Sequence, residues 1–196
     1  MYRPEQFIEG HPSSPVWVIS LNPKAATDWR DDRSADDLLA AFAQTSGNAG
    51  PAKRSLKDHP FFRDFERVSA RLYELLGEEN GVAHTDIVKC SSVTFRPRQA
   101  TNKDAQAIVA NCRPYLEEQL SRWQPRIVLC NGAPILRALK DIVKPVESKR
   151  TSYVGVLGGQ EVAVVLSGFF GRLDNYAKAR LGEEVESFMD RLGISG

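Results

Sequence analysis

The pattern of apolar positions first becomes regular in a short segment that ends in an Asn-Pro pair. Residues Val16–Leu21 begin with four consecutive apolar residues, which predicts a strand covered on both faces. Pro23 lacks a backbone donor and has a fixed φ, so it ends the strand and biases Asn22 toward an extended or turn conformation. Two interpretations stay open. The pair is either an ordinary turn, or an amide held at a strand end to orient a water or read a base edge.

Apolar residues recur at strand or helix spacing through the rest of the chain. Further strands are predicted at Val82–Val88, Arg126–Cys130, Val154–Leu157 and Val162–Leu166. Helices are predicted at Asp36–Ala43, at Phe61–Leu76, from Lys103 through a break or kink at Pro114 to Trp123, at Ile135–Ile142 and at Tyr176–Leu192. Because strands alternate with helices, we expect an α/β fold in a single domain over residues 1–196. The expected architecture is a three-layer α/β/α sandwich with a mainly parallel central sheet of about four strands.

Composition narrows the class of protein. A chain of 196 residues with 26% charged and 42% hydrophobic residues is typical of one soluble globular domain. No apolar run reaches the roughly 18 residues that a membrane span needs, and the amino terminus lacks the apolar core of a signal peptide. Three scattered cysteines favour a reducing compartment, so we expect a cytoplasmic protein. A net charge of +1 gives no support to a strongly basic nucleic-acid binder, although it is compatible with a local basic patch.

Two long polar connections stand out among the predicted elements. The first runs from Asn22 to about His59, and the second covers Ser91–Asn102. Long connections with little regular structure are often lids or binding loops. The chain has no glycine-rich dinucleotide fingerprint and no phosphate-cradling loop ending in Gly-Lys-Ser/Thr, so neither of these nucleotide sites is predicted.

Six segments carry a resemblance to a known family. They are Leu21-Asn22-Pro23, His59-Pro60-Phe61-Phe62, Thr85–Cys90, Cys112–Leu120, Pro125–Leu129 and Gly132-Ala133. In this order they resemble the motifs of the uracil-DNA glycosylase superfamily, and the likeness covers most of the chain from Val16 to Leu166. The first motif is similar to that of the mismatch-specific and single-strand-selective branches, and the middle of the chain is similar to the iron–sulfur branch. The resemblance implies the uracil-DNA glycosylase fold and a hydrolase that cleaves the N-glycosidic bond of a deaminated or damaged base in DNA.

The resemblance assigns roles to the first two motifs. Asn22 would position the attacking water, with Pro23 beside it in the base-binding turn. Phe61 would stack on the flipped base, and Phe62 is the second choice for the stacking ring. An aromatic pair that opens an apolar helix is also typical of a hydrophobic core, and this alternative stays open.

Asp86 stands where the family has a base-reading asparagine. An amide both donates and accepts hydrogen bonds, whereas an ionised carboxylate only accepts. Asp86 would therefore repel a uracil carbonyl unless it is protonated. It would instead accept from an amino or imino group, as on cytosine, guanine or an oxidised purine. Alternatively, Asp86 caps a loop or pairs with Lys89 or an arginine.

The family's second catalytic motif, usually His-Pro-Ser-like, is missing after the last predicted parallel strand. The chain reads Ser167-Gly168-Phe169-Phe170-Gly171-Arg172 there, and its histidines are His11, His59 and His84. We expect His84 to be a strand residue. The missing histidine stabilises the departing anionic base, so Ser167 and Arg172 are its expected substitutes. Phe169 or Phe170 would fill the gap left by the flipped base.

Basic and sulfur-containing residues complete the candidate site. Lys24, Arg96 and Arg98, with Phe169 and Arg172, are the expected DNA contacts, although a solvated loop face explains the basic residues equally well. Cys90 and Cys112 stand where the iron–sulfur branch has two of its four cluster ligands. Because no cysteine precedes Cys90, we expect no metal and no other cofactor.

Three functions are compatible with these residues. The first is a divergent base-excising hydrolase whose Asn22, Phe61, Asp86 and Ser167 converge on one cleft. The second is a catalytically inactive nucleic-acid- or nucleotide-binding protein that retains the fold. The third is an unrelated small-molecule hydrolase, since one fold supports many functions. For the first, the expected partner is single- or double-stranded DNA, bound by a monomer without membrane contact.

Overall fold

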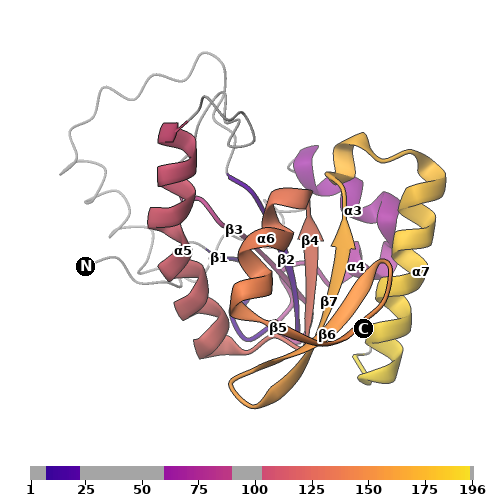
Figure 1. Ribbon diagram of the computed structural model, residues 1–196. Coiled ribbons are helices and arrows are strands. Elements are labelled where there is room, and N and C mark those ends of the chain that lie inside the picture. The colour runs from indigo at the N-terminus through magenta and orange to yellow at the C-terminus, as the bar shows by residue number, and fades with distance from the viewer. Residues whose placement is uncertain (1–7, 23–59, 90–102, 195–196) are drawn as a thin grey trace.

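A mixed β-sheet forms the centre of the protein (Figure 1). The computed structural model describes residues 8–22, 60–89 and 103–194. Within these residues the sheet has seven strands in the order β1-β3-β2-β4-β7-β6-β5. Their bounds are β1 Ile8–Glu9, β2 Val16–Ser20, β3 Val82–Asp86, β4 Ile127–Asn131, β5 Lys144–Ser148, β6 Ser152–Leu157 and β7 Gln160–Ser167.

The four predicted long strands form the parallel middle of the sheet. β3, β2, β4 and β7 are neighbours in that order, and each pair is parallel. β1 adds to β3 in antiparallel fashion, and β6 and β5 extend the other edge as an antiparallel meander. The predicted sheet of about four strands was therefore too small. β5 is exposed along its whole length and β1 is two residues long, so neither carries the apolar pattern that predicts a strand.

Helices cover both faces of the sheet, as predicted for an α/β fold. Their bounds are η2 Pro60–Phe62, α3 Arg63–Val68, α4 Ala70–Glu74, α5 Lys103–Trp123, α6 Ala133–Ile142, η3 Phe170–Arg172 and α7 Asn175–Arg191. Figure 1 shows α5 and α6 on one side of the sheet and α3, α4 and α7 on the other. Within the described residues, no helix is both long enough and apolar enough to cross a membrane.

Two helix predictions need correction and one lies outside the described residues. The predicted helix Phe61–Leu76 is divided at Ser69, whose backbone is extended at φ −158° and ψ 127°. The Ser69 side chain caps α4 by accepting a hydrogen bond from the Leu72 amide at 3.0 Å. Pro114 does not end the third helix, because α5 runs continuously through it. The helix predicted at Asp36–Ala43 lies outside the described residues.

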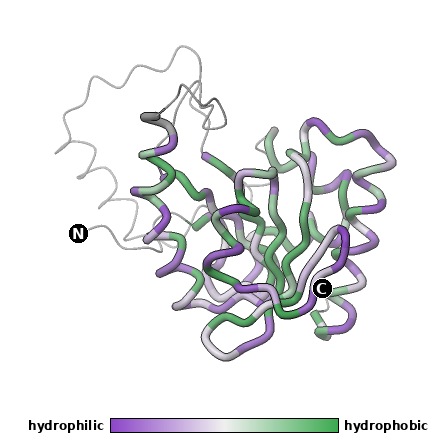
Figure 2. The backbone as a smooth tube through the Cα atoms, viewed as in Figure 1, coloured by the Kyte–Doolittle hydropathy of each residue, from purple (hydrophilic) through white to green (hydrophobic). Residues whose placement is uncertain are grey.

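Alternation along the strands divides the core in two. Val16 and Val18 of β2 pack into the cluster that contains α3 and α7, whereas Trp17 and Ile19 pack against α5 and α6. Figure 2 shows the strands of the parallel middle as mostly hydrophobic, and the helices as alternating between hydrophobic and hydrophilic. The same alternation places the last residue of β2, Ser20, on the α3–α7 side.

Candidate active site

The polar ends of four parallel strands lie along one edge of the sheet. Ser20 at the end of β2 is paired in register with Asp86 at the end of β3. Asn131 at the end of β4 is paired with Ser167 at the end of β7. Asn22 follows β2 by two residues and is half-buried. In open α/β sheets, this carboxyl edge is where ligands bind.

A buried hydrogen-bond network runs under this edge. His84 is 3% exposed, and its Nδ1 lies 2.5 Å from Oε2 of Glu9 on β1. Its Nε2 lies 2.9 Å from Oγ of Ser20, which also accepts a hydrogen bond from Nδ2 of Asn131 at 3.0 Å. Oδ1 of Asn131 then accepts from the Phe170 amide at 2.8 Å. Residues from β1, β3, β2, β4 and η3 are thus held together, so the ends of these elements have fixed relative positions.

An aromatic cluster covers the His84 ring. The ring centroids of Phe61 and Phe62 lie 5.1 Å and 5.4 Å from that of His84, and Phe65 follows at 6.2 Å. Phe62 is 2% exposed and belongs to the core, as the core interpretation of the aromatic pair expected. Phe61 is half-buried and packs against the edge of this core. Of the two rings, Phe61 is the more exposed.

Asp86 presents an unusual carboxyl group. Its Oδ1 is buried and has no hydrogen-bond partner among the described residues. The pKa of Asp86 is raised to about 6: burial raises it most, the charge on Glu9 also raises it, and the charges on His84 and Lys89 lower it. A carboxyl group with this pKa changes charge close to neutral pH, so it can serve as an acceptor or as a donor.

Lys89 lies beside Asp86 but donates to other oxygens. Its Nζ donates to Oγ1 of Thr85 at 2.9 Å, to Oε1 of Gln119 at 2.8 Å, and to the main-chain oxygen of Asp86. Burial lowers the pKa of Lys89 to about 8, although the charge on Asp86 favours the protonated form. Lys89 therefore connects the end of β3, through Thr85 and the Asp86 main chain, with α5, through Gln119.

The two adjacent phenylalanines after β7 differ in burial. Phe170 is 1% exposed and packs in the core against Phe65, at a ring-centroid distance of 5.4 Å. Phe169 is 45% exposed, and a Cβ on Gly171 would lie 2.8 Å from its ring. Ser167 is half-buried and Arg172 is exposed. Phe169 is therefore the phenylalanine of this segment that can reach a ligand.

The remaining predicted site residues lie outside the described part of the chain. These are Pro23, Lys24, Arg96 and Arg98, and the same holds for His59 and Cys90. Cys112 and Cys130 are free and buried. In the described ranges, no group of three or more His, Cys, Asp or Glu side chains is arranged to hold a metal ion.

Sequence reasoning missed three members of the network. Glu9 lies on a two-residue strand that has no apolar pattern. Ser20 and Asn131 each end an otherwise apolar strand, and this polar terminus is the signal that marks them. His84 is a strand residue, as expected, but its two ring nitrogens connect β1 with β2.

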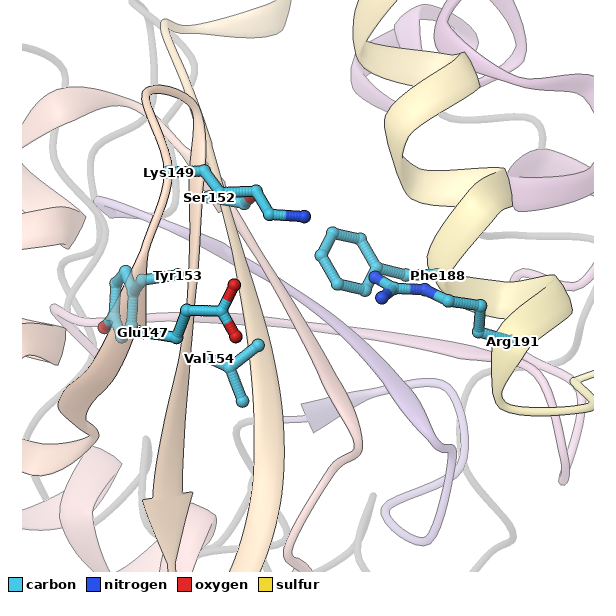
Figure 3. Close-up of a pocket in the computed structure, with 7 residues that line it drawn as sticks. All are labelled: Glu147, Lys149, Ser152, Tyr153, Val154, Phe188 and Arg191. Atoms are coloured by element: carbon cyan, nitrogen blue, oxygen red, sulfur yellow. The ribbon is translucent and has the colours of Figure 1, made fainter.

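A small pocket lies elsewhere, between the β5–β6 hairpin and the last turns of α7 (Figure 3). Its lining residues are Glu147, Lys149, Ser152, Tyr153, Val154, Phe188 and Arg191. None of the predicted site residues takes part in it. The guanidinium of Arg191 lies over the Phe188 ring, 4.3 Å from its centroid. The carboxyl edge of the parallel strands therefore remains the candidate site.

Comparison with models of known protein families gives a match over most of the chain. The model of the family described as "Uracil DNA glycosylase superfamily" matches residues 7–178, which include β1 to β7 and every residue of the buried network. No curated protein matches the chain.

Proposed function

Because the chain belongs to the uracil-DNA glycosylase superfamily, we propose that it cleaves the N-glycosidic bond of a deaminated or damaged base in DNA. The observation that carries the proposal is the edge formed by the ends of β2, β3, β4 and β7. Polar side chains from all four strands gather there over an aromatic cluster, and one buried carboxyl oxygen has no partner among the described residues. A flipped base needs these features: a stacking ring and polar groups that read its edge.

Asn22 and Phe61 act on opposite parts of the substrate. Cleavage creates positive charge on the sugar, and Asn22 orients the water that attacks it. Phe61 stacks on the base after it has left the helix. The support for these roles is that Asn22 directly follows the carboxyl end of a central parallel strand and that Phe61 is the more accessible ring of its pair.

Asp86 selects the base. As a carboxylate it accepts hydrogen bonds from an amino or imino group, and as a neutral acid it donates one to a carbonyl. Its unpartnered Oδ1 supports this role, because a buried acceptor without a partner costs about 1–3 kcal/mol unless a ligand supplies a donor. Ser167 and Arg172 stabilise the departing anion, and Phe169 fills the space the base has left.

Basic side chains supply the DNA contacts. Lys24, Arg96 and Arg98 bind phosphates from the long connections, and Arg172 does so from the segment after β7. The whole chain acts as one domain and as a monomer, in the cytoplasm and without a cofactor.

A second function is favoured by a specific observation. No histidine follows β7, so the residue type that usually stabilises the departing base in this family is missing. The alternative is a catalytically inactive protein that keeps the site to bind nucleic acid or a nucleotide. Turnover separates the two functions, because both predict binding.

The test is base release from single-stranded and duplex oligonucleotides that carry uracil, hypoxanthine, xanthine or a mismatch. Asn22→Ala is run beside the wild type to remove the proposed water-orienting amide. Glu183→Gln, a neutral substitution on the exposed side of α7, is the matched control. Release that is lost in Asn22→Ala and kept in Glu183→Gln supports the glycosylase. Binding without release by the folded wild type supports the alternative.

A further inference from the structure

His84 has a position that the proposed chemistry does not explain. It is a buried imidazole whose two ring nitrogens contact different strands, Glu9 on β1 and Ser20 on β2. Glu9 and His84 are directly paired in the antiparallel register of β1 and β3. Two residues further along β3, on the same side of the sheet, lies Asp86. Both ring nitrogens are thus hydrogen-bonded, as a buried imidazole requires, and one of the two partners is a carboxylate that can stabilise a charged ring.

We propose that His84, held by Glu9, is a positioning residue that keeps Asp86 as a carboxylate near neutral pH, so that the site accepts bases whose edge carries N–H donors. This inference rests on the proposed function, in which Asp86 reads the base. The ligand class is a base with an amino or imino group on the edge that faces Asp86, in contrast to one that presents only carbonyl oxygens.

Charge around His84 favours the imidazolium. Burial lowers the pKa of His84, but the charge on Asp86 and the hydrogen bond with Glu9 outweigh burial, and the net pKa is raised. Lys89 is the cation near enough to oppose this, and its Nζ is bonded to Thr85, to Gln119 and to the Asp86 backbone. Ser20 and Asn131 contribute neutral groups from β2 and β4.

The surrounding groups fit a charged ring. The aromatic rings from η2 and α3 supply no charge of their own, and those of Phe61 and Phe62 lie within the distance at which a cation is attracted to an aromatic ring. When His84 is charged, both ring nitrogens donate, one to Glu9 and the other to Ser20. When His84 is neutral, the Ser20 hydroxyl reverses and donates to Nε2. The network keeps its bonds in both states, so His84 can titrate without disrupting the strands.

The consequence for Asp86 follows from the sign of the interaction. A nearby positive charge stabilises a carboxylate, so the His84 imidazolium opposes the effect of burial on Asp86. Glu9 acts on Asp86 in two opposite ways: its own charge raises the pKa of Asp86, whereas its hydrogen bond with Nδ1 favours the His84 imidazolium, which lowers the pKa of Asp86. Without the imidazolium, Asp86 would remain protonated to a higher pH and would donate to carbonyl oxygens.

The experiment follows the titration of His84 and Asp86 by NMR in the full-length protein. The samples are wild type, Asp86→Asn, Glu9→Gln and His84→Gln, with Glu183→Gln as the matched control. His11 is exposed and bonded to Ser13, so its ring provides a reference signal in every sample. His84→Gln alters a buried residue, and the more conservative Asp86→Asn and Glu9→Gln variants keep the test decisive if it fails to fold.

We expect the His84 midpoint to fall in Asp86→Asn and also to fall in Glu9→Gln, because each variant removes a negative charge that favours the imidazolium. The Asp86 midpoint should rise in His84→Gln. A His84 midpoint that is unchanged in both carboxylate variants overturns the inference. In folded His84→Gln, an unchanged Asp86 midpoint overturns it as well.

A second readout separates this inference from the proposed function. Base release is measured from pH 5 to pH 9 for hypoxanthine and uracil substrates, and the ratio of the two rates is compared between wild type and Glu9→Gln. A pH profile of this ratio that shifts to higher pH in Glu9→Gln supports the positioning role, because loss of the Glu9 charge alone would lower the pKa of Asp86. A profile that is unshifted, or that shifts to lower pH, contradicts it. If His84 and Asp86 titrate as a coupled pair but no substrate releases a base, the proposed glycosylase activity and the base-selecting role of Asp86 are refuted. The charge coupling between His84 and Asp86 is then still supported. Release without coupled titration refutes the inference alone.

Discussion

Replacing Asp86 by asparagine should stabilise the protein in a pH-dependent way. The change removes a charge and keeps the shape of the side chain. In the folded protein the pKa of Asp86 is about 6, against an ordinary value near 3.8. The folded state therefore holds this proton more tightly than the unfolded state does. The stability that Asp86 contributes is complete below about pH 4 and is lost as the pH rises through 6.

The size of the effect follows from the shift. A difference of about 2 pH units, at about 1.4 kcal/mol for each unit, corresponds to about 3 kcal/mol. Asparagine stays neutral and does not incur this cost. The free energy of unfolding of Asp86→Asn minus that of wild type should therefore grow by about 3 kcal/mol in all between about pH 3 and pH 7, and about 2 kcal/mol of this growth should fall between pH 4 and pH 6.

Urea unfolding followed by tryptophan fluorescence measures this difference at each pH. Trp17 is fully buried, so its emission reports on loss of the core. Glu183→Gln makes the same kind of change on an exposed face and should show a much smaller dependence on pH. A difference that stays constant from pH 4 to pH 6, or that favours the wild type at the higher pH, would refute the assignment of a buried, proton-binding Asp86.

Four further substitutions test other parts of the structure. Gly182→Ala should destabilise the protein by about 3 kcal/mol in urea unfolding, because the new Cβ would lie 1.9 Å from the Val68 carbonyl oxygen. In an exposed helix the same change usually stabilises by about 1 kcal/mol. A stabilisation of that size here would contradict the close approach of α7 to α3. Ser69→Ala should cost about 1–2 kcal/mol in thermal unfolding, because it removes the α4 cap and the 2.5 Å bond to Glu186, and an unchanged melting temperature would argue against both contacts. Phe169→Ala should lower base release with little effect on stability, whereas Phe170→Ala should cost about 3–5 kcal/mol of stability; equal losses of stability in the two variants would show that Phe169 is also part of the core.

The hydrogen-bond network under the carboxyl edge stabilises the fold, and it also holds the strand ends that carry the candidate site. Asn131 holds Ser20 on one side and the Phe170 amide on the other, so it fixes the start of η3 relative to β2. Glu9 and His84 extend this support to β1 and β3. Within the described residues, Asp86 departs from this pattern, because one of its oxygens has no partner. Natural proteins place such local costs at functional sites.

The sequence by itself determined the parallel middle of the sheet. β2, β4 and β7 each contain a run of apolar residues long enough to identify a buried strand, and the segment Val82–Val88 that includes β3 begins and ends with an apolar pair. The helices between the strands repeat at their own period. Because parallel strands joined by helices share one carboxyl edge, the sequence also determined which segments meet there. Asn22 was singled out by its place after a strand and by the family resemblance, whereas Asp86 and Ser167 were singled out by the resemblance alone. Their chemical roles remain predictions.

Only the tertiary structure decided the edge strands, the burial of individual aromatic residues and the protonation of buried groups. β1 and β5 exist because their backbones pair with a neighbouring strand, and backbone hydrogen bonds leave no trace in side-chain hydrophobicity. Burial separated Phe61 from Phe62 and Phe169 from Phe170, although each pair is adjacent in sequence. The protonation of Asp86 and the partners of His84 depend on charges that come together from different strands. Such groups act through distance and solvent exclusion, and both quantities appear only when the chain has folded.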